Sequence, residues 1–265
     1  MPVRTTPSPR TLRIALLAVV LLAFAGGRAV GQPSPLWDHY KAYQVQPPLT
    51  HPTVVSLLDQ FMQSTHQVDV LEWFANPVMK EHAGVTFPIN RPELHYTWWR
   101  ITQQPFTMDV IARNQFGDQP LRLGMSRYLL NPANKNAPAG VPLPLANHYK
   151  CYDCTGPVIS VPLVLTDQFY TRNAVNLIPV FFCTPVEKRT QEGGIYPMTD
   201  PRQHYTVYDI GPETPIWPAT IADQFIPVTP VQLTSDRLLM VPTDKSFPPT
   251  STKPSTWGRL KQLYR

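Results

Sequence analysis

The chain has 265 residues, a formal net charge of +5 and a sequence pI near 9.1. Four of its 23 basic residues lie in residues 1–31, which hold no acid, so the remaining chain carries 19 basic and 18 acidic side chains. Because a nucleic-acid surface needs a concentrated basic stripe, this balance excludes nucleic acid as the expected partner.

Residues 1–31 are typical of an export signal. Arg4, Arg10 and Arg13 form a basic start, residues 14–25 form a short apolar core, and Ala29-Val30-Gly31 is a small-residue cleavage site. Twelve apolar residues are fewer than the roughly 20 that a membrane-spanning helix needs. We therefore expect an exported protein (periplasmic, cell-surface or extracellular) with no transmembrane segment in its mature chain. The alternative is that the segment is retained as an N-terminal anchor.

Four copies of one unit follow the signal. Each copy opens with a heptapeptide beginning His-Tyr, reaches an Asp/Asn-Gln-Phe block 20 or 21 residues later, counted from His to Gln, and closes with Pro-x-x-Lys. The opening histidines are His39, His95, His148 and His204. The closing lysines are Lys80, Lys135, Lys188 and Lys245. We predict a signal peptide at 1–31, repeats at 32–89, 90–143, 144–199 and 200–249, and a basic tail containing Pro and Ser at 250–265.

Composition and periodicity predict an all-β fold. The 32 prolines exceed the usual share of about 5% and argue against long helices. Val55, Leu57, Asp59 and Phe61 alternate with period two, which is typical of one face of a strand. We expect each repeat of about 55 residues to hold three or four short antiparallel strands. The four units form either a closed ring, resembling a propeller or barrel, or an open array of sandwich-like units.

The first residue of each Asp/Asn-Gln-Phe block shares the face of the flanking apolar residues. These positions are Asp59, Asn114, Asp167 and Asp223. A buried carboxylate needs hydrogen bonds, and the amide in the second copy supplies an acceptor without a charge. We therefore predict that these side chains accept hydrogen bonds from turn backbone, in preference to a catalytic or metal-binding role.

The four opening histidines suggest one metal hypothesis. In a closed ring, His39, His95, His148 and His204 would meet on the axis, and histidine is the commonest metal ligand. Each would have to project inward and have a partner for its other ring nitrogen. We favour the interpretation that each histidine is a hydrogen-bonded residue at the start of a strand, and we expect no cofactor.

The three cysteines all lie in the third copy. Cys151 aligns with Ala42, Trp98 and Val207 of the other copies, and Cys183 aligns with Ala75, Leu130 and Met240. Where one position loses cysteine, so does the other, which predicts a Cys151–Cys183 disulfide in an oxidising compartment. The alternative, a redox motif at Cys151 and Cys154, requires a helix N-terminus rather than a strand. We expect Cys154 to be a buried free thiol.

The repeat resembles an uncharacterised domain that recurs in exported bacterial and archaeal proteins. Its pattern runs His-x-x-Cys-Tyr-x-Val, then Asp-Gln-Phe-Gly, then Leu-Cys-x-Pro-x-x-Lys, and residues 148–188 match it best. Only the third copy keeps both cysteines, and only the second keeps a glycine, Gly117, after Gln-Phe. The resemblance covers His39 to Lys245 and implies export, repetition and the disulfide, but no activity.

The sequence contains no nucleophile elbow, no HExxH zinc motif and no phosphate-binding glycine loop. We therefore expect that the protein is not an enzyme. Trp98 and Trp99 align with core positions of the other copies rather than forming a sugar-stacking platform. The leading hypothesis is an exported structural or protein-binding module at the cell surface or envelope. The second is a glycan- or small-ligand-binding protein with its site between repeats. If function is localised, it should lie where the copies differ.

Overall fold

A computed structural model describes residues 37–248 of the chain, and every regular element among them is a β-strand. The expected signal peptide at 1–31 and the basic tail at 250–265 lie outside the described residues. The first six strands are β1 (His39–Leu58), β2 (Gln63–His82), β3 (Val85–Phe87), β4 (His95–Ile101), β5 (Met108–Asn114) and β6 (Gly117–Lys135). The remaining six are β7 (His148–Thr155), β8 (Ile159–Thr166), β9 (Thr171–Thr190), β10 (Ile195–Tyr196), β11 (His204–Ala222) and β12 (Thr229–Ser246). The all-β prediction is confirmed.

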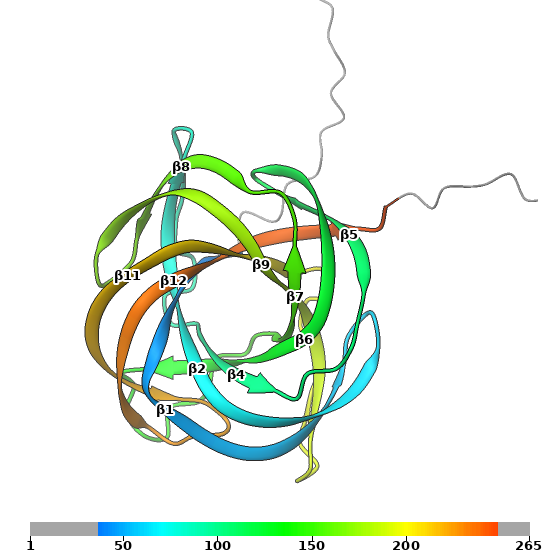
Figure 1. Cartoon of the computed structure of the whole chain (residues 1–265). Helices are drawn as coiled ribbons and strands as arrows, with labels where there is room; N and C mark the ends of the chain where they lie inside the picture. The colour runs from blue at the N-terminus through cyan, green and yellow to red at the C-terminus, as the bar shows by residue number, and fades with distance from the viewer. Residues whose placement is uncertain (1–36, 249–265) are drawn as a thin grey trace, which may run out of the picture. The chain divides into compact units, whose positions relative to one another are not determined.

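The backbone pairings of eight strands form a closed circuit. Antiparallel pairs run in the order β1–β2–β4–β6–β7–β9–β11–β12, and β12 pairs with β1 again. Figure 1 shows these strands following one another around a common centre. The first and last strands of the described chain therefore satisfy each other's backbone groups and leave no open edge in this circuit.

Several strands are much longer than expected. The prediction of short strands was wrong for β1, β2 and β9, with 20 residues each, and for β6, β11 and β12, with 18 or 19, because proline interrupts the ladder without ending the strand. In β1 the register breaks between Gln44 and Leu49, where Pro47 and Pro48 have no N–H to donate. The strand bends there, and its second half forms an outer hairpin with β2.

Each outer hairpin also pairs with a distant strand. The end of β1, Val55–Leu58, pairs with Glu187–Thr190 of β9, and Val164–Thr166 of β8 pairs with Met79–Glu81 of β2. The corresponding ends of β5 and β11 pair with β12 and β6. The hairpin of each predicted repeat therefore meets the closing strand of the repeat that is two copies away.

Because successive side chains of a strand point to opposite faces, neighbouring residues pack into different cores. Trp98 belongs to the inner cluster, with Tyr40, Tyr96 and Met240, whereas Trp99 belongs to a cluster under the outer hairpins. Both tryptophans are fully buried, which confirms that they are core residues. The inner cluster fills the centre of the strand circuit with side chains.

Candidate functional site

The acidic residue of each Asp-Gln-Phe block closes a tight turn at a hairpin tip. Asp59 Oδ1 accepts hydrogen bonds from the N–H groups of Phe61 and Met62, at 2.7 and 2.8 Å. Asp167 and Asp223 do the same for the two residues that follow their glutamines. Asn114 Oδ1 accepts from Phe116 N–H at 2.9 Å. The structure thus places these four predicted residues at turn backbone, where an acceptor oxygen is required.

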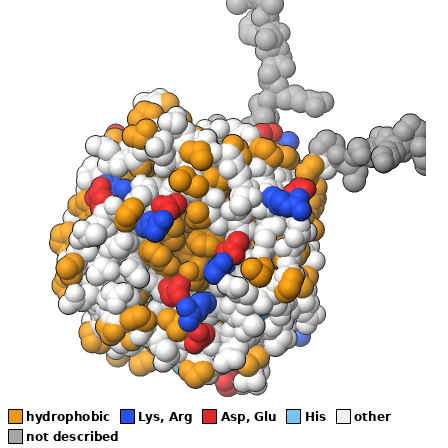
Figure 2. All heavy atoms as spheres, in the orientation of Figure 1, with side chains coloured by type: hydrophobic (Ala, Val, Ile, Leu, Met, Phe, Trp, Pro, Cys, Tyr) orange, Lys and Arg blue, Asp and Glu red, His pale blue; other side chains and the backbone are white. Residues whose placement is uncertain are grey.

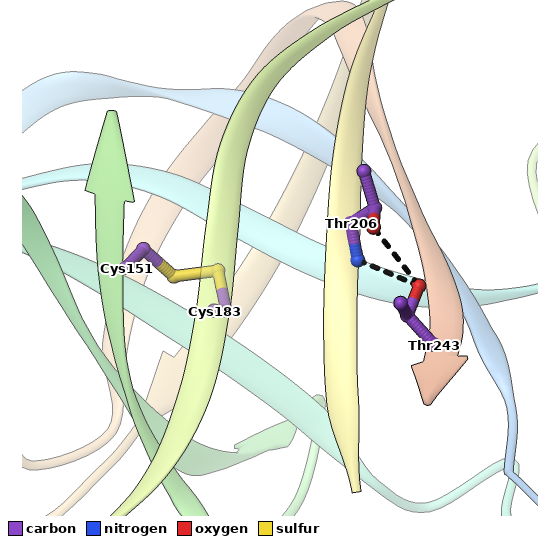
Figure 3. The surroundings of a disulfide bond; sticks show 4 residues. All are labelled: Cys151, Cys183, Thr206 and Thr243. Atoms are coloured by element: carbon purple, nitrogen blue, oxygen red, sulfur yellow. Dashed lines mark hydrogen bonds between the residues drawn. A yellow bond between two sulfur atoms is a disulfide. The ribbon is translucent and has the colours of Figure 1, made fainter. Parts of the chain in front are cut away.

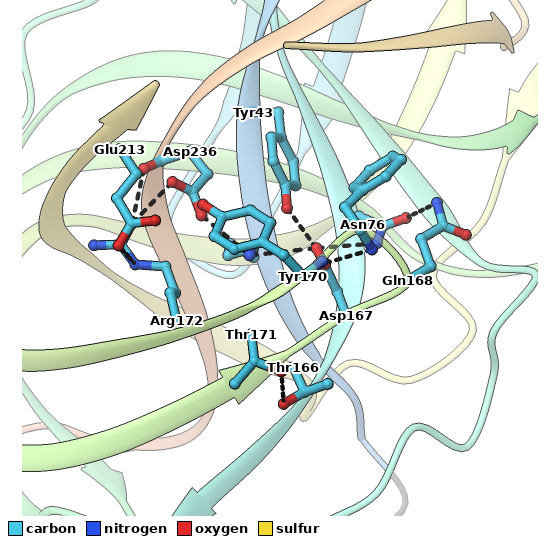
Figure 4. Close-up of polar contacts among 12 residues, drawn as sticks. Tyr43, Asn76, Thr166, Asp167, Gln168, Tyr170, Thr171, Arg172, Glu213 and Asp236 are labelled. Atoms are coloured by element: carbon cyan, nitrogen blue, oxygen red, sulfur yellow. Dashed lines mark hydrogen bonds and ion pairs between the residues drawn. The ribbon is translucent and has the colours of Figure 1, made fainter. Parts of the chain in front are cut away.

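The second side-chain oxygen ties each hairpin to another strand. Asp59 Oδ2 accepts from Tyr152 Oη at 2.6 Å and forms an ion pair with Lys150 Nζ at 2.7 Å. Asp167 Oδ2 accepts from Tyr43 Oη at 2.6 Å, as Figure 4 shows. The charge-assisted bonds are buried and therefore strong, provided that both partners stay in place.

The other two ties use different donors. Asp223 Oδ2 accepts from Trp99 Nε1 at 2.7 Å and from Thr97 Oγ1 at 2.5 Å, while Asn114 Nδ2 donates to Tyr208 Oη at 2.9 Å. Each tie joins predicted repeats that are two apart. Burial and the adjacent carboxylate raise the pKa of Tyr43 and Tyr152, so both phenols remain protonated donors.

The closing lysines form a second set of contacts that the sequence did not lead us to expect, and two of them, Lys80 and Lys188, are fully buried. Lys135 Nζ donates to Asn76 Oδ1 and Lys188 Nζ donates to Asn131 Oδ1, both at 2.6 Å. Lys245 Nζ donates to the Gln60 side chain. Each ammonium also lies 4.8–5.0 Å from the centre of a phenylalanine ring of an Asp/Asn-Gln-Phe block.

Lys80 is the exception among these lysines. Its Nζ is fully buried without a hydrogen-bond partner and lies 4.1 and 5.0 Å from the ring centres of Phe87 and Phe116. The fourth predicted repeat has Val241 where the first and second have Asn76 and Asn131, so this aligned position offers Lys80 no amide oxygen. Desolvation lowers the pKa of Lys80 to about 7.

The four opening histidines lie in separate contacts, three of them polar and one aromatic. His39 Nε2 lies 3.2 Å from Gln115 Nε2, His148 Nε2 lies 3.1 Å from Gln224 Oε1, and His204 Nε2 lies 2.7 Å from Gln60 Nε2. His95 packs on the ring of Phe74. Burial lowers the pKa of all four, to about 3 for His95 and about 4 for His204.

The metal-ring hypothesis finds no support in this arrangement. Each imidazole is held by the glutamine or aromatic ring of a neighbouring segment instead of facing the other three histidines. Within residues 37–248, no three His, Cys, Asp or Glu side chains are grouped so that they could hold a metal.

The predicted disulfide is confirmed. Cys151 of β7 and Cys183 of β9 lie directly opposite each other in the ladder and are bonded, as Figure 3 shows. Cys154 is a buried free cysteine, and desolvation raises the pKa of its thiol to about 12. Because the thiolate is the reactive form, Cys154 is inert at neutral pH.

One group of aromatic side chains differs between the copies and is partly exposed. Trp73 and Phe181 are half-buried against the inner cluster, where Trp98 and Tyr128 contact Phe181 at ring-centre distances of 6.3 and 5.3 Å. These four residues are called the aromatic group below. Figure 2 shows hydrophobic side chains gathered in the middle of one face, with pairs of opposite charges around them.

Three ion pairs flank the aromatic group along the strands. Glu72, next to Trp73, pairs with Arg100 at 2.8 Å, and Arg127, next to Tyr128, pairs with Asp153 at 2.7 Å. The third pair joins Arg237 to Asp209 at 2.6 Å. An apolar aromatic centre with a charged rim is the composition of many protein-binding surfaces.

Comparison with known proteins gives one match. A family model described as a repeat of unknown function (DUF7450) matches residues 95–242, from the opening His95 of the second predicted repeat to Pro242 of the fourth. No curated protein and no solved structure matches the chain. In the part of the chain that the structure describes, no helix is long and apolar enough to cross a membrane.

Proposed function

The chain belongs to the family of the DUF7450 repeat, whose function is unknown, and we propose that it is an exported, non-catalytic module built from four copies of one β unit. In this proposal the copies make a rigid support at the cell surface or envelope, and the aromatic group binds a partner protein. The observation that carries the proposal is that the first residue of every Asp/Asn-Gln-Phe block is buried and joins one copy to another.

The same contacts recur in cyclic order, which supports four equivalent units. Tyr40, Tyr96, Tyr149 and Tyr205 meet edge to face in sequence, at ring-centre distances of 5.2, 5.6 and 5.3 Å, and Tyr205 returns to Tyr40 at 5.9 Å. Each closing lysine likewise meets the phenylalanine of the next copy, and that of the last copy meets Phe61 of the first. Open arrays do not supply the contact between last and first units.

The hydrogen bonds of the buried aspartates also support a structural role. Asp59 and Asp167 use both oxygens, one for the turn and one for a distant tyrosine, and are almost fully buried. A general acid or base must instead be within reach of a substrate proton. The disulfide between Cys151 and Cys183 supports an oxidising compartment, in keeping with the proposed export.

The aromatic group is the surface best suited to a protein partner. Aromatic side chains and arginine are enriched at the energetic centres of interfaces, where they bury large areas at little conformational cost. Trp73 and Phe181 supply the aromatic area, and Arg100 and Arg127 lie at the rim with their acids. These positions also vary between the copies, as a specific binding surface requires.

The test is retention of the exported protein in the envelope fraction. A Trp73→Asp/Phe181→Asp variant should move from the envelope to the soluble fraction while its thermal unfolding remains cooperative. Ile195→Asp, at an exposed position 60% accessible to solvent, serves as the control and should leave retention unchanged. Equal retention of all three proteins would contradict the assignment of the aromatic group, and a fully released wild type would contradict the envelope role.

A second candidate function is binding of a small ligand between predicted repeats. It is favoured by a pocket that brings together β7, the stretch that precedes it, and the turn containing Gln224. A glycan array tests its carbohydrate form, with saturable binding of a defined saccharide as the supporting result.

A further inference from the structure

Residues from three predicted repeats meet in one buried polar cluster. Lys188 of β9 and Asn131 of β6 are fully buried, and Asp223, in the turn that follows β11, is only 7% exposed. Lys188 Nζ lies 2.6 Å from Asn131 Oδ1, and Asn131 Nδ2 donates to Asp223 Oδ2 at 3.3 Å. These contacts orient the amide, because an ammonium only donates and a carboxylate only accepts. The side-chain carbonyl carbon of Asn131 is therefore held close to the lysine nitrogen.

Burial gives this lysine a chemistry that a surface lysine lacks. Desolvation lowers the pKa of Lys188 well below its usual value, so its ammonium readily loses a proton. The neutral amine is a nucleophile, and the Phe225 ring, 5.0 Å from Nζ, helps to exclude water from it. Amides react very slowly with amines in water. For groups held in contact and well oriented, however, the effective concentration reaches about 10⁵–10⁸ M.

A second, similar cluster lacks two of these features. Lys135 Nζ lies 2.6 Å from Asn76 Oδ1, and Asn76 Nδ2 donates to Asp167 Oδ2 at 3.3 Å. Lys135 is only half-buried, however, and the ammonium of Lys41 already lies 3.5 Å from the same Asp167 oxygen. In the first cluster the equivalent oxygen of Asp223 is bound by neutral donors instead. A carboxylate bound by neutral groups is better able to accept a proton than one that is paired with a cation.

We propose that Lys188 and Asn131 join through an intramolecular amide bond. Nζ attacks Cγ of Asn131, the bond between Cγ and Nδ2 breaks, and the side-chain nitrogen leaves as ammonia. In the adduct both nitrogens are bonded to the same carbon, so Asp223 takes the proton that Nζ loses and passes it to Nδ2. One ammonium and one primary amide thus give one secondary amide and one ammonium ion. Atoms and charge balance without an oxidant, a reductant or an added substrate.

The bond reinforces the support that the copies form. It links the second predicted repeat to the third and closes a loop between residues 57 positions apart, which includes β7. The reaction occurs once within the chain and turns over no substrate, so it goes beyond the proposed non-catalytic module without altering it. It is also independent of the envelope role, since the aromatic group supplies none of the reacting atoms.

The test is peptide mapping of the reduced mature chain, residues 32–265, by mass spectrometry. Trypsin does not cut after an acylated lysine, so peptides 128–135 and 173–189 should appear as one branched species, lighter than their sum by one ammonia, about 17 Da. Mapping is needed in addition to the intact mass, because an N-terminal Gln32 also loses ammonia when it cyclises. Recovery of two separate peptides, with Asn131 intact or converted to aspartate, overturns the proposal.

Two matched variants test the proton carrier. Asp223→Asn keeps an acceptor for the turn backbone, as Asn114 does in the second copy, but it cannot carry the proton. Its linked fraction should fall at least about tenfold. Asp167→Asn makes the same change in the second cluster and should leave the linked fraction unchanged. Cooperative thermal unfolding checks that both variants fold, and equal linkage in Asp223→Asn and the wild type contradicts the role of Asp223. Neither result affects the envelope-retention test, so the two failures are distinguishable.

Discussion

Replacing Lys80 with methionine should stabilise the protein, even though Lys80 is as deeply buried as any core residue. Its ammonium has no hydrogen-bond partner, and desolvation lowers its pKa from 10.5 to about 7. At 1.36 kcal/mol per pKa unit, the charged form costs as much as about 5 kcal/mol in the folded state below pH 7. Methionine fills a similar volume but loses the contacts with the Phe87 and Phe116 rings, so we expect a net gain of about 2–3 kcal/mol at pH 6.

The sign of the pH dependence follows from proton binding. Between pH 7 and 10.5 the unfolded chain keeps the Lys80 proton while the folded chain releases it, so wild-type stability rises with pH across this window. Lys80→Met lacks this contribution, and its advantage over the wild type should shrink steadily from pH 7 to pH 10. Urea unfolding of both proteins at pH 6, 8 and 10 measures this difference.

Lys188→Met is the matched control. Lys188 is also fully buried, and desolvation lowers its pKa well below the usual value, but its Nζ donates to Asn131 Oδ1 at 2.6 Å, so its removal leaves a buried acceptor unpaired. We expect a loss of about 1–3 kcal/mol at pH 6. If Lys80→Met also destabilises the protein at pH 6, or if its stability runs parallel to that of the wild type from pH 7 to 10, the reasoning about the missing acceptor is wrong.

Four other outcomes are expected. Asn114→Asp restores the acid found in the other copies. It should raise the pKa of Lys80 from about 7 towards about 8, the value for Lys135 and Lys245. NMR titration measures this shift, and an unchanged pKa would place Lys80 away from that turn. Asp167→Ala should cost about 1–3 kcal/mol more than Asp167→Asn, because only asparagine keeps an acceptor for Phe169 and Tyr170 N–H; the reverse order in urea unfolding would contradict this role. Burial lowers the pKa of the four opening histidines, so they are neutral in the folded protein. At pH 5 unfolding should therefore take up about four protons, and stability should fall from pH 6.5 to pH 4. Calorimetry in buffers of different ionisation enthalpy measures this uptake, and it would show none if the histidines were already charged. Replacing Cys151 and Cys183 by alanine should lower stability by about 2–4 kcal/mol, and mass mapping of the wild type should link these two cysteines and leave Cys154 free.

Comparison of the four copies predicted local features well. Trp98 and Cys151 occupy one aligned position, so a core role for one implied a core role for the other, and both are fully buried. The disulfide followed from the joint absence of Cys151 and Cys183 in the other copies. These inferences needed only the strand period and the alignment, both of which are local properties of the sequence.

Long-range partners were not predictable in the same way. The tie between Asp167 and Tyr43 joins residues 124 positions apart, and hydrophobic periodicity says nothing about such pairs. One signal was present: the third position of the opening heptapeptide is Lys41 and Lys150 in the first and third copies, but threonine in the second and fourth. This alternation matches the ion pairs of Lys41 with Asp167 and Lys150 with Asp59, which join those two copies.

The buried lysines were missed for a related reason. Lysine is almost never fully buried unless it is paired, and nothing in the Pro-x-x-Lys pattern indicates burial of its last residue. Lys80 and Lys188 are nevertheless fully buried, because outer hairpins from other copies cover them. Their environment depends on the closure of the strand circuit, which counting strands could not establish.

The most direct test of the account is whether the first and last strands pair in solution. In NMR spectra of the mature chain, the closed circuit predicts cross-strand backbone contacts between Tyr40 and Met240 and between Ala42 and Leu238, with slowly exchanging amides on β1 and β12. An open array of units would instead show neither contact, together with rapid amide exchange along one edge of β1, and would contradict the proposed four-unit module.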